Sequence, residues 1–326
     1  MSKRNKIFAL LLMAILLVAC AGGAKKRETE KEAIFEVLSS KFIEMLSKND
    51  STKDNDDEPD NTHEEPTVRD GDDYAINEDV NVQESVIYDD GGIKVTVLSL
   101  DFRGWMGPEL RFLIENNSEK AIMLQASDLV INGYMINPIM SAEVEAGEKV
   151  NDELTVLNSD LESAGIETIQ YFSFNLRVID SADWAETFIT DTIRIETDAN
   201  PAFIQKVDDS GTVLVEQNGV RIIMKELLTE QEFWGAELLL FIENDSGQDI
   251  SVTVKDVTAN GLAVNPLFYA DVLSGTKAFA GLGFLENDLK EKGISDIREI
   301  ELYFNVIDKN NFRAVFKTDK ITITFD

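Results

Sequence analysis

The last two-thirds of this chain is one sequence written twice. Residues 105–180 align with residues 233–308 at a constant offset of 128 without a gap, and 27 of the 76 aligned positions are identical. Short motifs recur intact, such as Asn132-Gly133 with Asn260-Gly261 and Asn116 with Asn244. Chance does not produce this density of identity, so the chain carries a tandem duplication. Whatever structure the repeat forms, the chain must form it twice.

The residue pattern within each repeat is typical of β-strands. Apolar and polar side chains alternate over 172–178 in the first copy and over 300–306 in the second, which is the period of a half-buried strand. Asn132-Gly133 and Asn260-Gly261 predict tight type I′ hairpins, because both residue types tolerate a positive φ. Further strands of the first copy are predicted at residues 93–100, 109–115, 121–130, 134–144, 151–157 and 187–196.

One short helical segment interrupts the strands of each copy. In the first copy it covers residues 160–164, with Ser159 as the N-cap and Gly165 as the C-terminal stop. Its counterpart at 288–292 ends at Gly293.

Together these elements predict an all-β chain with two tandem immunoglobulin-like β-sandwich domains, over residues 85–198 and 212–326. A small barrel for each copy is the alternative. The joint around residues 200–211 is short, so we expect two neighbouring sandwiches with limited hinge freedom.

The first residues predict export and lipid anchoring. Lys3, Arg4 and Lys6 precede an apolar run at 7–19, which suits a signal peptide and is too short to span a bilayer comfortably. Leu17-Val18-Ala19-Cys20 resembles a bacterial lipobox, and Cys20 is the sole cysteine. The resemblance implies a lipoprotein signal peptide over 1–19 and a diacylated Cys20 that holds the chain on the extracellular face of the cell membrane. An ordinary signal peptide with an incidental cysteine is the alternative.

Two segments separate the anchor from the repeats. Residues 20–49 contain apolar side chains at helical spacing between 32 and 46, which predicts a short amphipathic helix that lies on lipid or is only marginally formed in water. Residues 50–84 are dominated by Asp, Glu, Asn and Thr, which predicts a disordered acidic linker.

Composition excludes several kinds of chemistry. The formal net charge of −31 argues against nucleic-acid binding, which needs a basic surface. The only histidine is His63, in the linker, so the repeats have no Ser-His-Asp or Cys-His arrangement and no zinc site built on His and Cys. We therefore expect no enzyme activity, cofactor or metal. A carboxylate-based hydrolase remains open, because 61 acidic residues offer many pairs.

Large apolar side chains recur before one strand of each copy. Trp105 and Met106 correspond to Phe233 and Trp234. They form either a binding surface for a protein or a sugar, or a cap that folds over the open end of each core; the swapped position of the Trp favours the cap. Trp184 corresponds to Phe312, for which core packing is expected.

Three features carry a resemblance: the lipobox, the acidic linker, and the paired repeats with their segment Gly-Pro-Glu-Leu-x-Phe-Leu-Ile-Glu-Asn-Asn-Ser at 107–118. In these features the chain resembles uncharacterised cell-surface lipoproteins of Gram-positive, clostridial-type bacteria, which have tandem immunoglobulin-like domains of unknown function. The resemblance implies architecture and carries no functional residues. We therefore expect a non-catalytic, lipid-anchored extracellular protein that binds a protein or an envelope polymer. A structural spacer or a subunit of an envelope complex, without a ligand, is the alternative.

Overall fold

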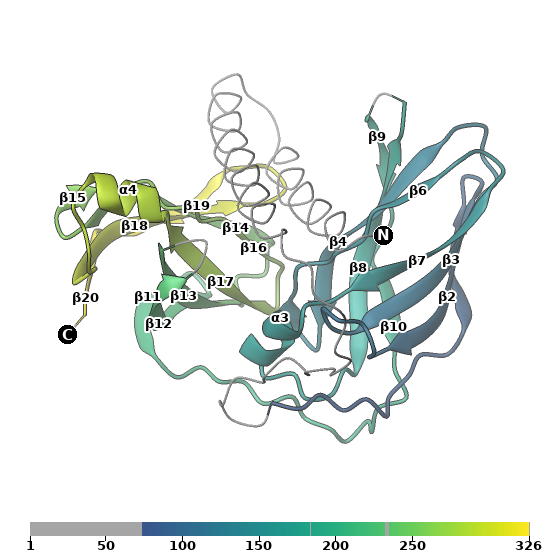
Figure 1. Ribbon diagram of the computed structural model, residues 1–326, viewed down its shortest axis with the longest axis horizontal. Coiled ribbons are helices and arrows are strands. Elements are labelled where there is room, and N and C mark those ends of the chain that lie inside the picture. Colours follow the sequence, from purple (N-terminus) through teal and green to yellow (C-terminus); the bar gives the residue numbers. More distant parts are fainter. Residues whose placement is uncertain (1–73, 183, 232–234, 326) are drawn as a thin grey trace, which may run out of the picture. The chain divides into compact units, whose positions relative to one another are not determined.

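The computed structural model describes residues 74–182, 184–231 and 235–325. Tyr74–Asp326 form one compact unit whose regular structure is mainly β-strands, with two short helices (Figure 1). The predicted signal peptide, Cys20, the helix at 32–46 and the first part of the linker lie outside the described residues.

The first repeat forms two facing sheets. One is antiparallel in the order β1-β2-β3-β7, and the other is built around the antiparallel pair β4 and β8. The rings of Phe112 on β3 and Phe174 on β8 meet edge to face between the sheets, with centroids 6.2 Å apart. The elements are β1 (Ser85–Asp90), β2 (Ile93–Asp101), β3 (Glu109–Asn116), β4 (Ile122–Ile131), β5 (Tyr134–Met135), β6 (Ala142–Val144), β7 (Lys149–Thr155), α3 (Asn158–Ser163), β8 (Tyr171–Asp180), β9 (Glu186–Ile189) and β10 (Ile193–Glu196).

The second repeat has the same arrangement. Its first sheet has the order β11-β12-β13-β17, and its second is built around the antiparallel pair β14 and β18. The elements are β11 (Thr212–Gln217), β12 (Val220–Gln231), β13 (Gly235–Asn244), β14 (Ile250–Ala259), β15 (Leu262–Ala263), β16 (Ala270–Val272), β17 (Thr276–Phe284), α4 (Glu286–Glu291), β18 (Glu299–Asp308), β19 (Ala314–Lys317) and β20 (Ile321–Thr324). The predicted all-β sandwich fold is confirmed.

The alternating strands supply the core of each repeat. Four alternating apolar side chains in each of β8 and β18 are at most 1% exposed: Phe172, Phe174, Leu176 and Val178 in the first repeat, and Ile300, Leu302, Phe304 and Val306 in the second. Burying one such side chain contributes about 1.5–3 kcal/mol. The period-two pattern therefore identified the strands that hold each sandwich together.

The turn motifs shared by both repeats act as predicted. Asn132 and Gly133 have φ of 50° and 87°, and Asn260 and Gly261 have φ of 50° and 76°. The Asn116 side chain is fully buried and donates to the carbonyls of Lys120 and Val144 at 2.8 and 2.9 Å. Asn244 makes the equivalent two bonds at 2.9 and 2.8 Å. A buried amide thus ties the loop after β3 or β13 to its sheet in each repeat.

A shared sheet joins the two repeats. β5 pairs parallel with β17, with Tyr134 opposite Lys277 and Met135 opposite Ala278. The backbone N–H of Lys277 donates to the carbonyl of Gly133 at 2.9 Å. This pairing continues the β4–β8 sheet of the first repeat into the β17-β13-β12-β11 sheet of the second. The predicted neighbours are therefore connected strand to strand, in addition to the connecting segment at 200–211.

Three aromatic rings fill this joint. Tyr134 is 1% exposed, and its ring stacks on Phe279 at a centroid distance of 6.3 Å and an angle of 11°. Phe241 lies 6.5 Å from Tyr134 and 5.0 Å from Phe279. At the equivalent places the first repeat has Leu113 for Phe241 and Asn151 for Phe279. The aromatic cluster therefore belongs to the joint and is not part of the repeated fold.

An ion pair also crosses the joint. Lys309, at the end of β18, contacts the carboxylate of Asp128 on β4 and lies 3.7 Å from that of Asp271. Asp128 has a φ of 53° at an irregularity in the pairing of β4 with β8. The equivalent of Lys309 in the first repeat is Ser181.

Four sequence predictions need correction. The strand predicted at 187–196 is divided into β9 and β10, because the Thr190 hydroxyl, and not a backbone carbonyl, accepts from the Leu176 N–H. The strand predicted at 134–144 is divided into β5 and β6, because Pro138 has no N–H to donate to a ladder. Ser159 is not the N-cap of α3, since the helix begins at Asn158 and Leu157 occupies the cap without a side-chain bond. The C-terminal part of the predicted linker, from residue 74 to residue 84, packs on the first repeat: Val80 and Val82 are 5% and 8% exposed. Alternating apolar residues in an acidic segment are enough to bury part of it.

Candidate functional site

Two equivalent hairpins, β8–β9 and β18–β19, carry the candidate site. In the second repeat the turn runs from Asp308 to Arg313, and the Asp308 N–H donates to the Arg313 carbonyl at 2.8 Å. Within the turn, the Phe312 N–H donates to the Asp308 carbonyl at 2.9 Å. The Asp308 carboxylate accepts from the N–H groups of Asn310 and Asn311 at 2.9 and 3.0 Å. This side chain fixes the turn by bonding its own backbone.

The first repeat has the same frame. The Asp180 N–H donates to the Ala185 carbonyl at 2.9 Å, and the Trp184 N–H donates to the Asp180 carbonyl at 2.9 Å. The Asp180 carboxylate accepts from the Ala182 N–H at 3.0 Å. Asp180 and Asp308 therefore begin equivalent turns in the two repeats.

Each hairpin presents an aromatic side chain from a left-handed backbone position. Trp184 and Phe312 both have a φ of 60°, and their exposed fractions are 56% and 49%. The expectation that both rings pack into the cores is wrong. The left-handed conformation at the end of the turn directs the side chain away from the sheet, so neither ring reaches the sandwich interior.

The left-handed position is costly for these residues. Glycine or asparagine normally occupies it, and a bulky side chain there costs about 1–2 kcal/mol. About half of each ring remains in contact with water, so burial compensates for this cost only in part. Strain of this kind is found at functional sites more often than elsewhere. Its recurrence in both repeats is the strongest sign of a site in the described residues.

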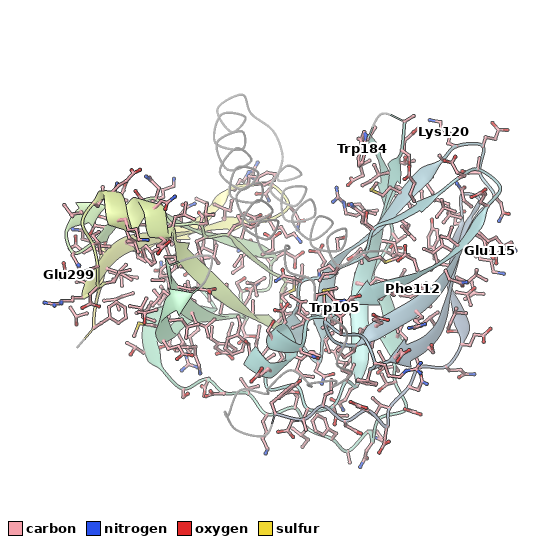
Figure 2. All side chains as sticks on the ribbon, viewed as in Figure 1. Trp105, Phe112, Glu115, Lys120, Trp184 and Glu299 are labelled. Carbon is pink, nitrogen blue, oxygen red and sulfur yellow. The ribbon has the colours of Figure 1, made fainter. Side chains whose placement is uncertain are left out.

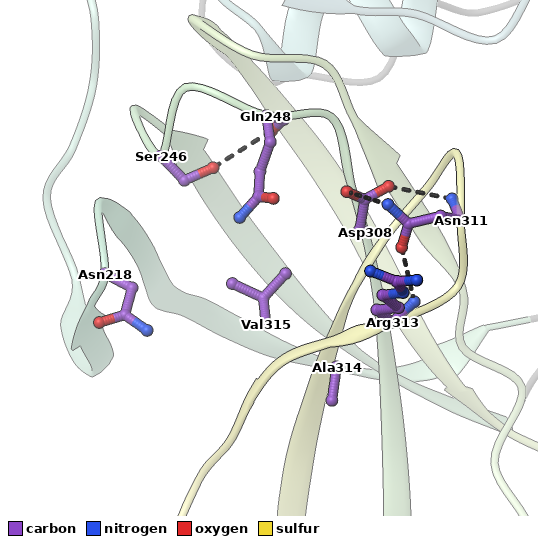
Figure 3. Close-up of a pocket in the computed structure, with 8 residues that line it drawn as sticks. All are labelled: Asn218, Ser246, Gln248, Asp308, Asn311, Arg313, Ala314 and Val315. Atoms are coloured by element: carbon purple, nitrogen blue, oxygen red, sulfur yellow. Dashed lines mark hydrogen bonds between the residues drawn. The ribbon is translucent and has the colours of Figure 1, made fainter.

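A pocket of about 520 Å³ lies beside the hairpin of the second repeat (Figure 3). It is bounded by the β11–β12 turn, by the loop between β13 and β14, and by the hairpin itself. The lining residues are Asn218, Ser246, Gln248, Asp308, Asn311, Arg313, Ala314 and Val315. Six of these eight carry polar side chains, while Ala314 and Val315 form its apolar part.

Several polar groups in the pocket are available for a ligand. The side-chain amides of Asn218 and Gln248 and the guanidinium of Arg313 make no hydrogen bond or ion pair with another described residue. Asp308 and Asn311 are already bonded to each other, with the Asn311 amide donating to the Asp308 carboxylate at 2.9 Å. Figure 3 shows the Gln248 side chain extending toward Val315 between Ser246 and Asp308.

The equivalent place in the first repeat is occupied by an ion pair. The Lys120 Nζ donates to the Asp180 carboxylate at 2.6 Å, and this bond, with that from Ala182, holds the pKa of Asp180 below its usual value. Lys120 and Trp184 both lie at this end of the repeat (Figure 2). Gln248 is the counterpart of Lys120. The second repeat thus lacks the ammonium group that satisfies the turn aspartate in the first.

The Trp105 surface predicted from the sequence lies at the other end of the first sandwich. Trp105 is in the β2–β3 loop, which follows the end of the β2–β3 pairing at Asp101 and Glu109. The hairpin lies near the opposite end of that pairing, where Ile93 is opposite Asn116. Trp105 is 57% exposed, so its ring does not cap the core as the sequence favoured. Met106 is half-buried, and its carbonyl accepts from the Asn158 N–H at 2.9 Å.

Their counterparts Phe233 and Trp234 lie outside the described residues. The combined surface of Trp105, Met106, Phe233 and Trp234 therefore stays a prediction. The sequence analysis did not identify the hairpin site. A usable signal was present, because an aromatic residue follows an aspartate by four positions in both copies: Trp184 after Asp180, and Phe312 after Asp308.

The described residues show neither a metal-binding cluster nor a membrane-spanning helix. In the part of the chain that the structure describes, no three His, Cys, Asp or Glu side chains are grouped so as to hold a metal ion. Neither described helix has the length and apolar character that crossing a membrane would need.

No protein-family model matches the chain, and no curated protein matches it. Solved structures to which the chain is similar include the YadV chaperone, with 12% identity, a TM-score of 0.20, and coverage of 67% of this chain and 92% of that one. A protein of unknown function from Porphyromonas gingivalis W83 has 13% identity, a TM-score of 0.20, and coverage of 72% and 100%. The Salmonella enterica SafA pilin in complex with the SafB chaperone has 10% identity, a TM-score of 0.16, and coverage of 67% of this chain and 89% of that one. At these values the function must be argued from the chain's own residues.

Proposed function

We propose that this chain is a non-catalytic binding protein, anchored through Cys20 to the extracellular face of the cell membrane, that holds a protein or an envelope polymer at the hairpin end of its repeats. One observation carries the proposal: both repeats present a half-exposed aromatic ring, Trp184 or Phe312, from a φ of 60°. Rings of this type are frequent anchors of binding interfaces.

The lipid anchor is supported by the sequence alone. Leu17-Val18-Ala19-Cys20 has the order of residues of a lipobox, and the acidic segment from 50 to 73 supplies length between the anchor and the repeats. A tether of this kind leaves the hairpins free to reach a partner.

Binding is favoured over catalysis by the contents of the pocket. Asp308 is its only carboxylate, whereas glycoside hydrolysis uses two carboxyl groups placed about 5–10 Å apart. The carboxylate also bonds three groups of its own turn, from Asn310 and Asn311. Its role is to hold the hairpin.

Binding is favoured over a spacer role by the rings themselves. A spacer gains nothing from strained, exposed aromatic side chains at its loop tips, because they lower stability and solubility together.

The test uses the mature chain from position 20 with Cys20→Ser, mixed with isolated envelopes of the cells that make it. Trp184→Gly and Phe312→Gly remove the rings, and glycine adopts the left-handed φ without strain. Ile204→Gly, at an 83% exposed apolar residue, is the matched control. We expect each ring to contribute about tenfold in affinity, or about 1.4 kcal/mol, measured by co-sedimentation.

Control binding should equal that of the unsubstituted chain. If the double variant binds envelopes as well as the unsubstituted chain does, the hairpin ends are not the binding surface. If the unsubstituted chain does not bind envelopes, the spacer alternative replaces the proposal.

A further inference from the structure

The pocket of the second repeat lies where the two repeats differ in sequence. Its Asn218, Gln248 and Arg313 correspond to Asp90, Lys120 and Ala185 in the first repeat. Two of the three changes replace a charged side chain with a neutral amide, and the third adds a guanidinium beside the hairpin. The sheets beneath are the same, so the fold did not require these changes.

The changed residues offer mixed hydrogen-bonding groups. Each amide of Asn218 and Gln248 supplies both donors and an acceptor, Arg313 supplies donors only, and Ser246 has a hydroxyl. A ligand hydroxyl is itself a donor and an acceptor, so it bonds to such a mixture without leaving a group unpaired. The amides and the guanidinium therefore suit a ligand with many hydroxyl groups, and Ala314 and Val315 suit the apolar face of its ring.

The charge of the pocket selects against ions. Arg313 and Asp308 are its only charged groups and have opposite signs. An anionic polymer meets the repulsion of a chain with a net charge of −31. A cationic ligand is attracted to the whole acidic surface and gains little from neutral amides. A neutral ligand is the class for which this lining is specific.

The half-exposed ring of Phe312 is a further group beside the pocket that can contact a ligand. It is the residue between Asn311 and Arg313, both of which line the pocket, and it is 49% exposed. The C–H face of a sugar ring packs on an aromatic ring while its hydroxyls bond to nearby polar groups.

We propose that the pocket lined by Asn218, Gln248 and Arg313 binds a neutral oligosaccharide. This rests on the proposed function, because it assigns a ligand class to the hairpin end of the second repeat. The first repeat, with its Lys120–Asp180 ion pair, is not a second copy of this site.

The substitutions that test this return the pocket to the state of the first repeat. Gln248→Lys places an ammonium group next to Asp308, as Lys120 is placed next to Asp180, and Asn218→Asp restores the residue of the first copy. Both positions are exposed and the first repeat folds with these residues, so the fold tolerates them. Gln83→Lys, at an exposed position on the first repeat, controls for the added charge.

Binding is measured by titration calorimetry of the mature Cys20→Ser chain with hexamers of N-acetylglucosamine, of β-1,4-linked glucose and of mannose. At least one hexamer should bind, Gln248→Lys and Asn218→Asp should each weaken it about tenfold or more, and Gln83→Lys should leave it unchanged. Binding that is equal in the pocket variants and the control would overturn the assignment, and so would failure of all three hexamers.

The two proposals fail in different ways. If the hexamers do not bind but the chain sediments with envelopes through Trp184 and Phe312, the glycan assignment is wrong and the binding function stands. If the chain neither binds hexamers nor sediments with envelopes, both are wrong.

Discussion

Tyr134→Ala removes the central ring of the joint between the repeats. Tyr134 is 1% exposed and stacks on Phe279, with Phe241 beside it. Its hydroxyl also donates to the Lys206 carbonyl in the connecting segment, at 3.4 Å. The substitution therefore opens a cavity at the place where the two repeats meet.

The expected cost follows from the burial of the ring. Truncating a fully buried aromatic side chain to alanine costs about 3–5 kcal/mol, which includes the cavity left behind. For a chain of this size each kcal/mol moves the melting temperature by about 2–4 °C, so we expect a decrease of roughly 6–20 °C. The hydroxyl bond adds little, because 3.4 Å is long for a hydrogen bond.

Differential scanning calorimetry of the mature Cys20→Ser chain measures this cost. Leu262→Ala is the matched control, since Leu262 holds the equivalent place in the second repeat and is 46% exposed. A surface substitution of this kind changes stability by about 0.5 kcal/mol or less. If Tyr134→Ala and Leu262→Ala lower the melting temperature equally, the joint does not stabilise the molecule and our reasoning about it is wrong.

Two further predictions concern equivalent residues of the repeats. Asp160 and Asp288 are equivalent residues whose pKa values shift in opposite directions. Burial raises the pKa of Asp160, one of whose carboxylate oxygens is buried without a partner among the described residues. Burial of Asp288 is outweighed by bonds from Lys292 and from the Asn265 N–H, which lower its pKa. A raised pKa in the folded state means that the ionised form costs stability at neutral pH and that the cost is lost as the pH falls through that pKa. Urea denaturation should therefore show Asp160→Asn stabilising by on the order of 1 kcal/mol at neutral pH, and this effect should disappear as the pH falls to about 4. Asp288→Asn should destabilise at neutral pH, because a lowered pKa contributes stability that is lost only as the pH falls below about 4. Effects of the same sign would contradict this assignment. Asn116→Ala and Asn244→Ala should each cost about 2–4 kcal/mol, because each leaves two carbonyls of a loop without their donor, while the exposed neighbour Asn117→Ala should cost much less in the same assay.

The strands and turns were predictable because their determinants are local. Alternation over 172–178 and 300–306 identified β8 and β18, since each side chain's burial depends only on its parity along the strand. Asn132-Gly133 and Asn260-Gly261 identified their turns, since both residues tolerate a positive φ. Pro138 is the local signal for the division of 134–144 into β5 and β6, because proline has no N–H for a ladder bond.

The joint and the hairpin site were not predictable from those local patterns. Tyr134 and Phe279 alternate like any half-buried strand residues, and only their replacement by Leu262 and Asn151 in the other copy marks a contact outside the repeat. The left-handed φ of Trp184 is set by the hydrogen bonds of its turn, and its residue type favours other conformations. Propensity alone therefore led to core packing, and the structure corrects it.

The shared sheet also affects how a chain of this kind can grow. On the outer edge of the first repeat, β7 has Asn151 and Asp152 where β17 has Phe279 and Ala280, and the second repeat has Leu262 where the first has Tyr134. Tandem duplication of one repeat would supply only one side of this contact, pairing either Tyr134 with Asn151 or Leu262 with Phe279. Lengthening the array by this strand pairing would therefore require a new aromatic residue at each added junction. In gene-duplication terms, the junction is a specialised part, and the repeats are no longer interchangeable units.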